Sequence, residues 1–515
     1  MEWTTLVVLF LEENMKQFKL YYTSDVHGYL LSTDYIKKGN QPLGLSNVAA
    51  NFKKDGNTII IDGGDMYQGS PMLQYLQKTH DIDAVTVAMN LAEYDYVTLG
   101  NHDFNFGYDT LQKHLTQLNA TVIAENVVDK SGNTLYPAQV KVLENGTKVG
   151  LIGLVTDYIN VWEKPEHLTG IMIESPLIKA SHTIAKLRQE VDVVIGVYHG
   201  GYERDMVTGK VVSDTSENIA WQLTKELDLD VLLTGHQHGN VSPRVINGVL
   251  TLQMPNQAKM YAEIDGIKTD DQWEISAETK PAGVVSQANI VTALQPLQTQ
   301  VENWLDQPIV QLDTGIPTQE PLFLAQYGNK ILAWIANVQL QASQSDITLV
   351  SLNNNPSSLP KNLTLRNILQ NYPFDNTLIT KRVSGHDLRL SLEHTAKYFV
   401  LNNGQLAVNP EWLMPKVEHY NYDLAFGITY ELDITRPMNE RVTKLQYHDV
   451  DIEDKDEFTI SMNNYRAVGG GNYQEYAQSK TILVGDQSIQ DMLITFFKTN
   501  KHLSDSPKLQ LKVKL

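Results

Sequence analysis

Short apolar runs alternate with polar turns and helical patterns over the first half of the chain, from Phe18 to about Asp265. The runs are rich in β-branched residues and occupy positions 19–23, 58–61, 96–99, 149–152, 192–198 and 230–233. Strands that are apolar on both faces and separated by helices are typical of buried sheets covered by helices. Residues 16–284 are therefore predicted to form a layered α/β domain, and its last part, residues 266–284, reads as polar and irregular.

A helical stripe follows this domain. Apolar residues recur at helical spacing, interrupted by Pro296, at positions 290, 294, 297, 301 and 305. We predict a linker helix within residues 285–312. The remaining residues, 313–515, mix helical segments such as "PLFLAQYGNKILAWIANVQLQAS" with strands such as "LITKRVSG" and "GITYELDIT". They predict a separate α+β domain.

Composition narrows the class of protein. A chain of 515 residues with 42% apolar residues is long enough for more than one core. The formal net charge of −19 argues against nucleic-acid polymers and anionic membranes as partners, although a small phosphorylated ligand stays possible because bound cations invert the potential locally. Since the chain has no cysteine, a metal ion would be held by histidine, carboxylate, amide or water.

The N-terminus contains one short apolar run, residues 6–11. No basic residue precedes it, and Glu12 and Glu13 follow directly, so it is a poor signal peptide and too short to span a bilayer. Met15 is a candidate physiological start. We expect a cytoplasmic protein.

Polar side chains follow five of the predicted strands at the point where each strand ends. Taken alone, each is explained by an ordinary turn or helix cap. Together they lie where open α/β sheets form their ligand crevice, beyond the carboxyl ends of the strands. The residues concerned are Asp25, His27, Asp65, Asn101, His102, His199, His236 and His238.

This donor set suits a dinuclear metal site. Mixed nitrogen and oxygen ligands fit Mn, Fe, Zn or Mg rather than copper. The two carboxylate oxygens of Asp65 make it the natural bridge between ions roughly 3.5–4 Å apart, the separation typical of two-metal hydrolases. A water between the ions would be acidified and aimed at phosphorus while both cations neutralise the phosphoryl oxygens. The sequence therefore predicts phosphoester hydrolysis.

The order of these motifs resembles that of the metallophosphoesterases: D-x-H, G-D, G-N-H-(E/D), a later His, and G-H-x-H. Over nearly the whole chain the sequence is similar to the two-domain 5'-nucleotidase family, which includes 2',3'-cyclic-nucleotide 2'-phosphodiesterase/3'-nucleotidases. The resemblance implies a four-layer α/β/β/α calcineurin-like domain, a linker helix, and an α+β substrate-binding domain of the 5'-nucleotidase type.

The resemblance also implies roles for single residues. One metal would be held by Asp25, His27, Asp65 and His238, and the other by Asp65, Asn101, His199 and His236. His102 would not be a ligand; it would stabilise the transition state or protonate the leaving oxygen. Asp103 is expected to be structural.

Asn105 stands where many 5'-nucleotidases carry an Asp that pairs with the catalytic histidine. An amide can orient the ring of His102, but it cannot stabilise imidazolium as a carboxylate would.

In the second domain the segment "SMNNYRAVGGGNY" resembles the part of these enzymes that binds the nucleobase. The resemblance implies that Tyr465 stacks on the base, with Tyr422 as its facing partner and Tyr420 as the alternative. Stacking of this kind tolerates any base. Polar groups for ribose and phosphate are expected near residues 353–355 and Arg366.

At two places the sequence differs from many 5'-nucleotidases in residues that would contact the substrate. The loop "SLNNNPSSLP" differs from the Asn-Gly-Gly loop of many 5'-nucleotidases, and Gly471 stands where many of them carry a sugar-binding Asp. The segments "NYPFDNTL" and "NNYRAVGGG" look nearer to the cyclic-phosphodiesterase branch.

We therefore expect a two-metal nucleotide phosphoesterase, leaning to 2',3'-cyclic-nucleotide 2'-phosphodiesterase/3'-nucleotidase. The alternative enzymes are a 5'-nucleotidase and a nucleotide-sugar or dinucleotide pyrophosphatase. A remote alternative from another class is a nucleotide-binding module that has lost catalysis. In the family the substrate is carried between the domains, so residues 285–312 are expected to contain the hinge.

Overall fold

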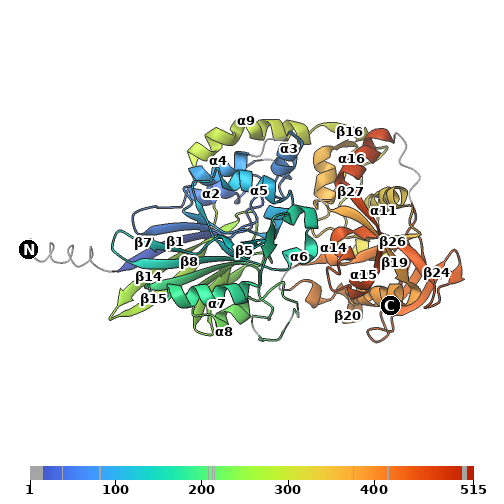
Figure 1. Ribbon diagram of the computed structural model, residues 1–515. Helices are drawn as coiled ribbons and strands as arrows, with labels where there is room; N and C mark the ends of the chain where they lie inside the picture. Colours follow the sequence, from blue (N-terminus) through green and yellow to red (C-terminus); the bar gives the residue numbers. More distant parts are fainter. Residues whose placement is uncertain are drawn as a thin grey trace, which may run out of the picture. The chain divides into compact units, whose positions relative to one another are not determined.

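The computed structural model describes residues 16–515 except residues 38, 80–82, 207, 212, 214, 375, 415–416 and 501–506. The apolar run at residues 6–11 and Met15 lie outside the described residues. The chain forms two compact units, of which the first ends at Val301 and the second comprises Glu302–Leu515 (Figure 1). In the described part of the chain, no helix combines the length and apolar character that a membrane span requires.

The first unit contains two six-stranded sheets. In the first sheet, β1 to β4 run parallel to their neighbours, and β14 pairs antiparallel with β1. Its strand order is β15 (Gln272–Pro281), β14 (Met260–Thr269), β1 (Gln17–Thr23), β2 (Thr58–Asp62), β3 (Tyr96–Val97) and β4 (Thr121–Val122).

The second sheet has a parallel centre with an antiparallel strand at each edge. Its strand order is β12 (Val241–Ile246), β13 (Val249–Gln253), β11 (Val231–Thr234), β10 (Val193–His199), β8 (Lys148–Val155) and β7 (Gln139–Val142). A smaller sheet joins β6 (Thr134–Tyr136), β5 (Ala124–Asp129) and β9 (Ile171–Ile173). All six predicted apolar runs coincide with strands.

Residues 266–284 are not irregular, contrary to the prediction, because β14 and β15 form a long antiparallel hairpin there. In β15 exposed and half-buried residues alternate, and Trp273, Ile275 and Ala277 pack against the buried core. This period of two, with polar residues on the outer face, is the pattern of a one-sided edge strand rather than of a loop.

The two large sheets share one core. Alternate residues of β1, β2, β8, β10 and β11 point between them, including Leu20, Ile61, Leu151, Ile195 and Leu233, all fully buried. Helices cover the outer faces: α2 (Leu45–Ala49), α4 (Asp83–Leu91) and α5 (Tyr108–Leu115) lie on one side, and α7 (Pro176–Leu187) and α8 (Ala220–Glu226) on the other (Figure 1). This is the expected four-layer α/β/β/α arrangement.

The predicted linker segment contains α9 (Ala288–Leu305). Its apolar stripe is buried at Ile290, Leu294, Val301 and Leu305, while Pro296 lies on the exposed side of the helix. The division between the two compact units falls inside this helix. The boundaries 16–284, 285–312 and 313–515 stay a prediction.

The second unit is α+β, as predicted. Its main sheet has the order β22 (Asp423–Phe426), β17 (Ile347–Ser351), β26 (Glu457–Asn463), β19 (Thr377–Ser384) and β27 (Lys480–Ser488). A second sheet joins β25 (Val450–Asp451), β24 (Val442–Tyr447), β23 (Thr429–Asp433) and β28 (Gln510–Lys514). The longer helices are α11 (Lys330–Ser343), α13 (Gly385–Ala396) and α16 (Ile489–Thr499), and the short helix α14 (Asn464–Ala467) follows β26.

Candidate dinuclear metal centre

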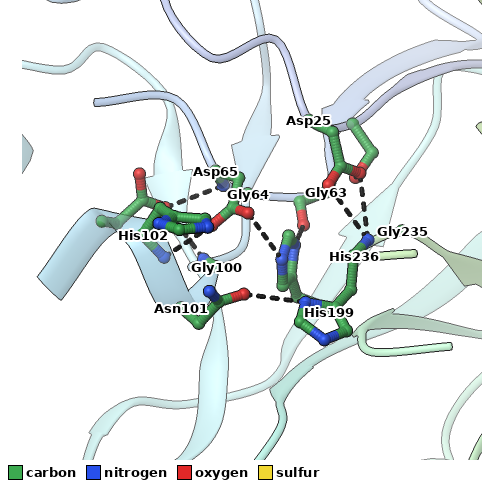
Figure 2. A network of polar contacts seen from close by, with 12 residues as sticks. Asp25, Gly63, Gly64, Asp65, Gly100, Asn101, His102, His199, Gly235 and His236 are labelled. Atoms are coloured by element: carbon green, nitrogen blue, oxygen red, sulfur yellow. Dashed lines mark hydrogen bonds and ion pairs between the residues drawn. The ribbon is translucent and has the colours of Figure 1, made fainter. Parts of the chain in front are cut away.

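The last residue of β10 and the loops that follow β1, β2, β3 and β11 bring the predicted polar side chains together. Figure 2 shows six of them: Asp25, Asp65, Asn101, His102, His199 and His236. These loops approach one another closely. A Cβ at Gly64 would lie 2.4 Å from the Gly100 nitrogen, and a Cβ at Gly100 would lie 2.2 Å from Asp65 Oδ1. Glycine at both positions therefore allows the loop that carries Asp65 to lie against the loop that carries Asn101 and His102.

Five of the predicted metal ligands have a backbone in the left-handed region, which non-glycine residues rarely adopt. The φ angles are 57° for Asp25, 50° for His27, 60° for Asp65, 71° for His236 and 57° for His238. Each such conformation costs on the order of 1–3 kcal/mol and is concentrated at functional sites. These backbone conformations direct the five side chains into one space beyond the strand ends.

The first group of side chains is Asp25, His27, Asp65 and His238, each of which offers a ligand atom within 4.8 Å of the others. The Nε2 atoms of His27 and His238 lie 2.9 Å apart, and His27 Nε2 lies 3.7 Å from Asp65 Oδ2. The Nδ1 atom of His27 donates to the Gln68 carbonyl oxygen at 2.8 Å. That bond leaves His27 Nε2 as the nitrogen that can bind a metal ion.

The second group is centred on His199. Its Nδ1 atom donates to the Gly63 carbonyl oxygen at 2.7 Å, and its Nε2 atom lies 3.2 Å from Asp65 Oδ2. Both atoms of that pair are buried, and apart from each other neither has a hydrogen-bond partner among the described residues. Beside them, His236 Nδ1 lies 2.8 Å from Asn101 Oδ1.

These observations fit a pair of divalent cations. Buried nitrogen and oxygen atoms that lack hydrogen-bond partners are costly unless an ion or water satisfies them. Here they converge from two sides on Asp65, whose Oδ2 atom faces both groups. The donors are imidazole, carboxylate and amide, which suit borderline or hard ions.

Carboxylates and imidazoles that can carry opposite charges face one another in this space. Burial alone would raise the pKa of Asp25 and Asp65, but the neighbouring imidazoles of His238 and His199 hold both below the usual range. Burial likewise disfavours the charged form of His199, yet Asp65 raises its pKa to about 10. Protonated imidazole thus supplies the positive charge that bound cations would supply instead, and metal binding would release protons.

His102 lies at the edge of this space, with its ring centroid 5.5 Å from that of His27. Its backbone N–H donates to Asp65 Oδ1 at 2.8 Å. Its Nδ1 atom lies 2.8 Å from Asn105 Oδ1, as expected for an amide that orients the ring. The structure therefore brings His102, Asn105 and the seven predicted ligands together.

Two neighbours of His236 were not predicted from the sequence. Glu217 Oε1 lies 3.1 Å from His236 Nε2, and the ring of Trp162 stacks on His236 with a centroid distance of 5.4 Å. Glu217 precedes α8 and Trp162 ends the short helix α6 (Ile159–Trp162). Neither position has a distinctive local pattern, so only the three-dimensional arrangement reveals them.

In the second unit Tyr465, on α14, lies near Tyr420, with ring centroids 6.2 Å apart. The ring centroid of Phe374 lies 5.9 Å from that of Tyr420, and Phe374 is 43% exposed. Tyr422, the predicted stacking partner, is instead fully buried, and its hydroxyl donates to the Ala325 carbonyl oxygen at 2.8 Å. The prediction for Tyr422 is wrong, because a ring packed in the core has no free face for a base; the next aromatic residue, Tyr420, lies beside Tyr465.

The polar groups expected near ribose and phosphate are engaged in the fold. Arg366 binds Glu302 and Asp306 at 2.5 and 2.8 Å. Gly471 has a φ of 72°, and a Cβ there would lie 2.5 Å from both Arg466 Nη1 and Asn421 Oδ1. A sugar-binding Asp therefore does not fit at position 471 without displacement of the buried Arg466.

Two family models match the chain. Residues 18–240 match the calcineurin-like phosphoesterase family, and residues 324–478 match the 5'-nucleotidase C-terminal domain. The chain is 27% identical to the trifunctional nucleotide phosphoesterase protein YfkN of Bacillus subtilis, over 89% of this chain and 36% of that protein. It is 24% identical to the 2',3'-cyclic-nucleotide 2'-phosphodiesterase/3'-nucleotidase of Yersinia enterocolitica, over 87% of this chain and 80% of that protein.

Solved structures agree with the fold. A crystal structure of a Staphylococcus aureus protein assigned as a 5'-nucleotidase superposes with a TM-score of 0.90 and 28% identity, covering 97% of this chain and 100% of that one. A 5'-nucleotidase precursor from Thermus thermophilus has a TM-score of 0.67 at 19% identity, covering 97% of this chain and 99% of that one. The chain thus spans about a third of the Bacillus subtilis relative and all of the Staphylococcus aureus chain.

Proposed function

Because residues 18–240 match the calcineurin-like phosphoesterase family and residues 324–478 match the 5'-nucleotidase C-terminal domain, we propose that this chain belongs to the two-domain family that joins them and is a nucleotide phosphoesterase dependent on two divalent metal ions. The observation that carries the proposal is the convergence of the His27, His199 and His238 imidazoles on Asp65 and Asp25. We propose hydrolysis of 2',3'-cyclic nucleotides and 3'-nucleotides as the preferred reaction.

The proposed ligands fall into two sets that share Asp65. One set is Asp25, His27, Asp65 and His238, and the other is Asp65, Asn101, His199 and His236. Two bound cations would neutralise the phosphoryl oxygens and lower the pKa of an attacking water. Mn, Zn, Fe and Mg all suit these donors.

The role proposed for His102 follows from its hydrogen bonds. Its backbone is tied to Asp65, and its Nδ1 atom is held by Asn105. Nε2 is then the ring nitrogen that faces a substrate, and when both ring nitrogens are protonated it can donate to a phosphoryl oxygen or protonate the leaving oxygen. In the second unit, Tyr465 is the proposed platform for the nucleobase, with Tyr420 as its neighbour.

Two features favour the cyclic-phosphodiesterase branch over a strict 5'-nucleotidase. Asn105 replaces the carboxylate that pairs with the catalytic histidine of many 5'-nucleotidases, and Gly471 replaces their sugar-binding Asp. The space around Gly471 agrees with the second feature, since Arg466 and Asn421 leave no room for a Cβ. Relatives in Yersinia, Haemophilus and Salmonella carry the name 2',3'-cyclic-nucleotide 2'-phosphodiesterase/3'-nucleotidase.

A substrate panel tests the proposal. Turnover of 2',3'-cyclic AMP, 3'-AMP, 5'-AMP and UDP-glucose is compared with Mn present. We expect the first two to be preferred. A preference for 5'-AMP by orders of magnitude would instead establish a 5'-nucleotidase, the activity named for relatives in Vibrio. Preferred turnover of UDP-glucose would establish a pyrophosphatase, and nucleotide binding without any hydrolysis would establish a binding module.

The cellular setting is also a proposal. We propose a cytoplasmic role in nucleotide catabolism, with residues 285–312 as the linker between residues 16–284 and 313–515. Cell fractionation tests the location, since recovery of the protein with periplasmic or extracellular markers would contradict it.

A further inference from the structure

A chain of hydrogen bonds extends from His102 away from the predicted metal ligands. His102 Nδ1 lies 2.8 Å from Asn105 Oδ1, Asn105 Nδ2 donates to Glu163 Oε2 at 2.6 Å, and His167 Nδ1 lies 2.7 Å from Glu163 Oε1. We propose that Glu163 is a positioning residue that acts on His102 through the side-chain amide of Asn105. The inference rests on the proposed function for its catalytic consequence, but not for its structural part.

Glu163 and His167 form the outer end of these linked hydrogen bonds. Glu163 directly follows α6, and its side chain is only 9% exposed. Its Oε1 atom accepts from His167 and from the backbone N–H of Lys164 at 3.0 Å, so both carboxylate oxygens are engaged. His167 lies on the following 3-10 turn (Pro165–Leu168) and holds the carboxylate oxygen that does not contact Asn105.

The two contacts of the Asn105 amide fix its orientation. An ionised carboxylate only accepts hydrogen bonds, so the atom of Asn105 that faces Glu163 has to be the NH2 group. The carbonyl oxygen of that amide then faces His102, and because it too only accepts, Nδ1 of His102 has to carry the proton. Glu163 thereby selects the neutral tautomer of His102 that carries its proton on Nδ1 and leaves Nε2 free to take up the proton that it would donate to the substrate.

The negative charge of Glu163 acts on His102 through this amide. A carboxylate that is hydrogen-bonded directly to a histidine both orients the imidazole ring and stabilises its positive form, whereas an amide only orients the ring. Here the carboxylate is displaced outward by one amide, and the short bond between Asn105 and Glu163 polarises that amide towards the ring. Asn105 and Glu163 together thus orient His102 and stabilise its positive form, which a single Asp does in many 5'-nucleotidases.

The tautomer of His102 tests the structural part without any catalysis. Metal-free full-length protein labelled with 15N-histidine is studied by long-range 1H–15N NMR at mildly alkaline pH, and the His102 signals are assigned by their loss in His102→Ala. We expect the Nδ1–H form in the parent protein and in Glu163→Gln, whose amide oxygen can still accept. Glu163→Ala frees the amide of Asn105 to turn, so the Nε2–H form should appear.

The matched control is Glu166→Ala, which removes an exposed carboxylate from the same turn. It should leave the His102 signals unchanged. The proposal is wrong if Glu163→Ala also leaves them unchanged, or if the parent protein already shows the Nε2–H form.

An exchange of charge tests the catalytic part. In the parent protein Glu163→Gln should lower kcat roughly tenfold with little change in KM, since a charge-assisted hydrogen bond is replaced by a neutral one. Asn105→Asp alone should be impaired, because it sets two carboxylates 2.6 Å apart, the distance that now separates Asn105 Nδ2 and Glu163 Oε2. Adding Glu163→Gln to Asn105→Asp should then raise kcat.

Glu163→Gln is thus expected to lower kcat in the parent protein and to raise it in Asn105→Asp. Such opposite effects are not expected of a residue that only supports the fold. If Glu163→Gln lowers kcat equally in both backgrounds, the proposed role in catalysis is overturned. If the parent protein hydrolyses no nucleotide, the proposed function fails, while the NMR result still decides whether Glu163 sets the tautomer of His102.

Discussion

The carboxylate of Asp103 accepts the backbone N–H of Asp65 at 3.0 Å. The same carboxylate also accepts the backbone N–H groups of Met66 and Tyr67 at 2.8 and 3.1 Å and that of Gly100 at 2.8 Å. One buried side chain thus holds both the loop that presents Asp65 and the loop that presents Asn101 and His102. This geometry agrees with the structural role expected of Asp103.

Replacing Asp103 by Asn should weaken metal binding without removing a ligand. One of the two oxygens becomes an NH2 group that faces backbone donors, and each unsatisfied buried N–H group costs about 1–3 kcal/mol. We expect a lower melting temperature and loss of Mn affinity, measured by calorimetry. The control is Asp109→Asn, an exposed carboxylate on α5 that should change neither quantity; parent-like Mn affinity in Asp103→Asn would contradict the prediction.

Removal of metal should destabilise the protein and abolish its activity. Asp65 Oδ2 and His199 Nε2 are buried and, apart from their 3.2 Å contact with each other, lack hydrogen-bond partners among the described residues, so a cation that satisfies them stabilises the folded state. At a free Mn concentration 100 times the Kd the gain is about 2.7 kcal/mol. Thermal unfolding after chelation and after Mn is restored measures it. An unchanged melting temperature would show that these atoms hold no metal.

His102→Ala should separate catalysis from metal binding. The side chain of His102 hydrogen-bonds to Asn105 rather than to a predicted metal ligand, and only its backbone N–H bonds to Asp65. Loss of a general acid or transition-state donor lowers kcat by about 10²–10⁴-fold. Metal content, measured by mass spectrometry of the purified variant, should stay at the parent level. Loss of metal together with activity would instead identify His102 as a ligand.

The catalytic half of the chain was largely predictable from sequence because its strands are short, apolar on both faces and followed directly by polar motifs. The ends of parallel strands meet at one sheet edge, so Asp25, Asp65 and His199 could be expected to lie together. The β14–β15 hairpin was missed because its polar outer face hides a period of two. Identification of the metal ligands from these positions stays a prediction.

The side chains around this centre were less predictable, since they depend on contacts between distant segments. Glu163 lies 58 residues after Asn105 in an irregular loop, and no local pattern marks it. Tyr422 shows the opposite error. It lies two residues from Tyr420, and sequence alone does not tell which of these two rings enters the core.

Two substitutions should distinguish the roles of these tyrosines. Tyr420→Ala should raise KM for nucleotides if Tyr420 contributes a stacking face beside Tyr465, by the equivalent of about 1–3 kcal/mol per stacked base. Tyr422→Phe removes the buried hydrogen bond to Ala325 and should lower stability by about 1 kcal/mol while KM stays unchanged. Steady-state kinetics and thermal unfolding measure the two effects. A raised KM in Tyr422→Phe alone would reverse the assignment.

The stability of the second unit should fall as the solution is acidified from pH 7 to pH 5, through His394. Burial of this side chain on α13 lowers its pKa to about 4, against an ordinary value of 6.5, and the nearby Lys397 and Arg466 act in the same direction. A histidine whose folded pKa is depressed binds fewer protons folded than unfolded between these two values. Stability therefore rises with pH across this window and is lost as pH falls.

The expected difference between pH 7 and pH 5 is about 2 kcal/mol for this one group. His394→Gln keeps a donor towards the Gly471 carbonyl oxygen, which His394 Nε2 now reaches at 2.9 Å, but it does not titrate. Thermal unfolding of the full chain should therefore depend less on pH in this variant. His386→Gln is the control, because His386 lies on the same helix with 56% of its side chain exposed. An equal pH dependence in His394→Gln and the parent protein would mean that His394 is accessible to protons in the folded state.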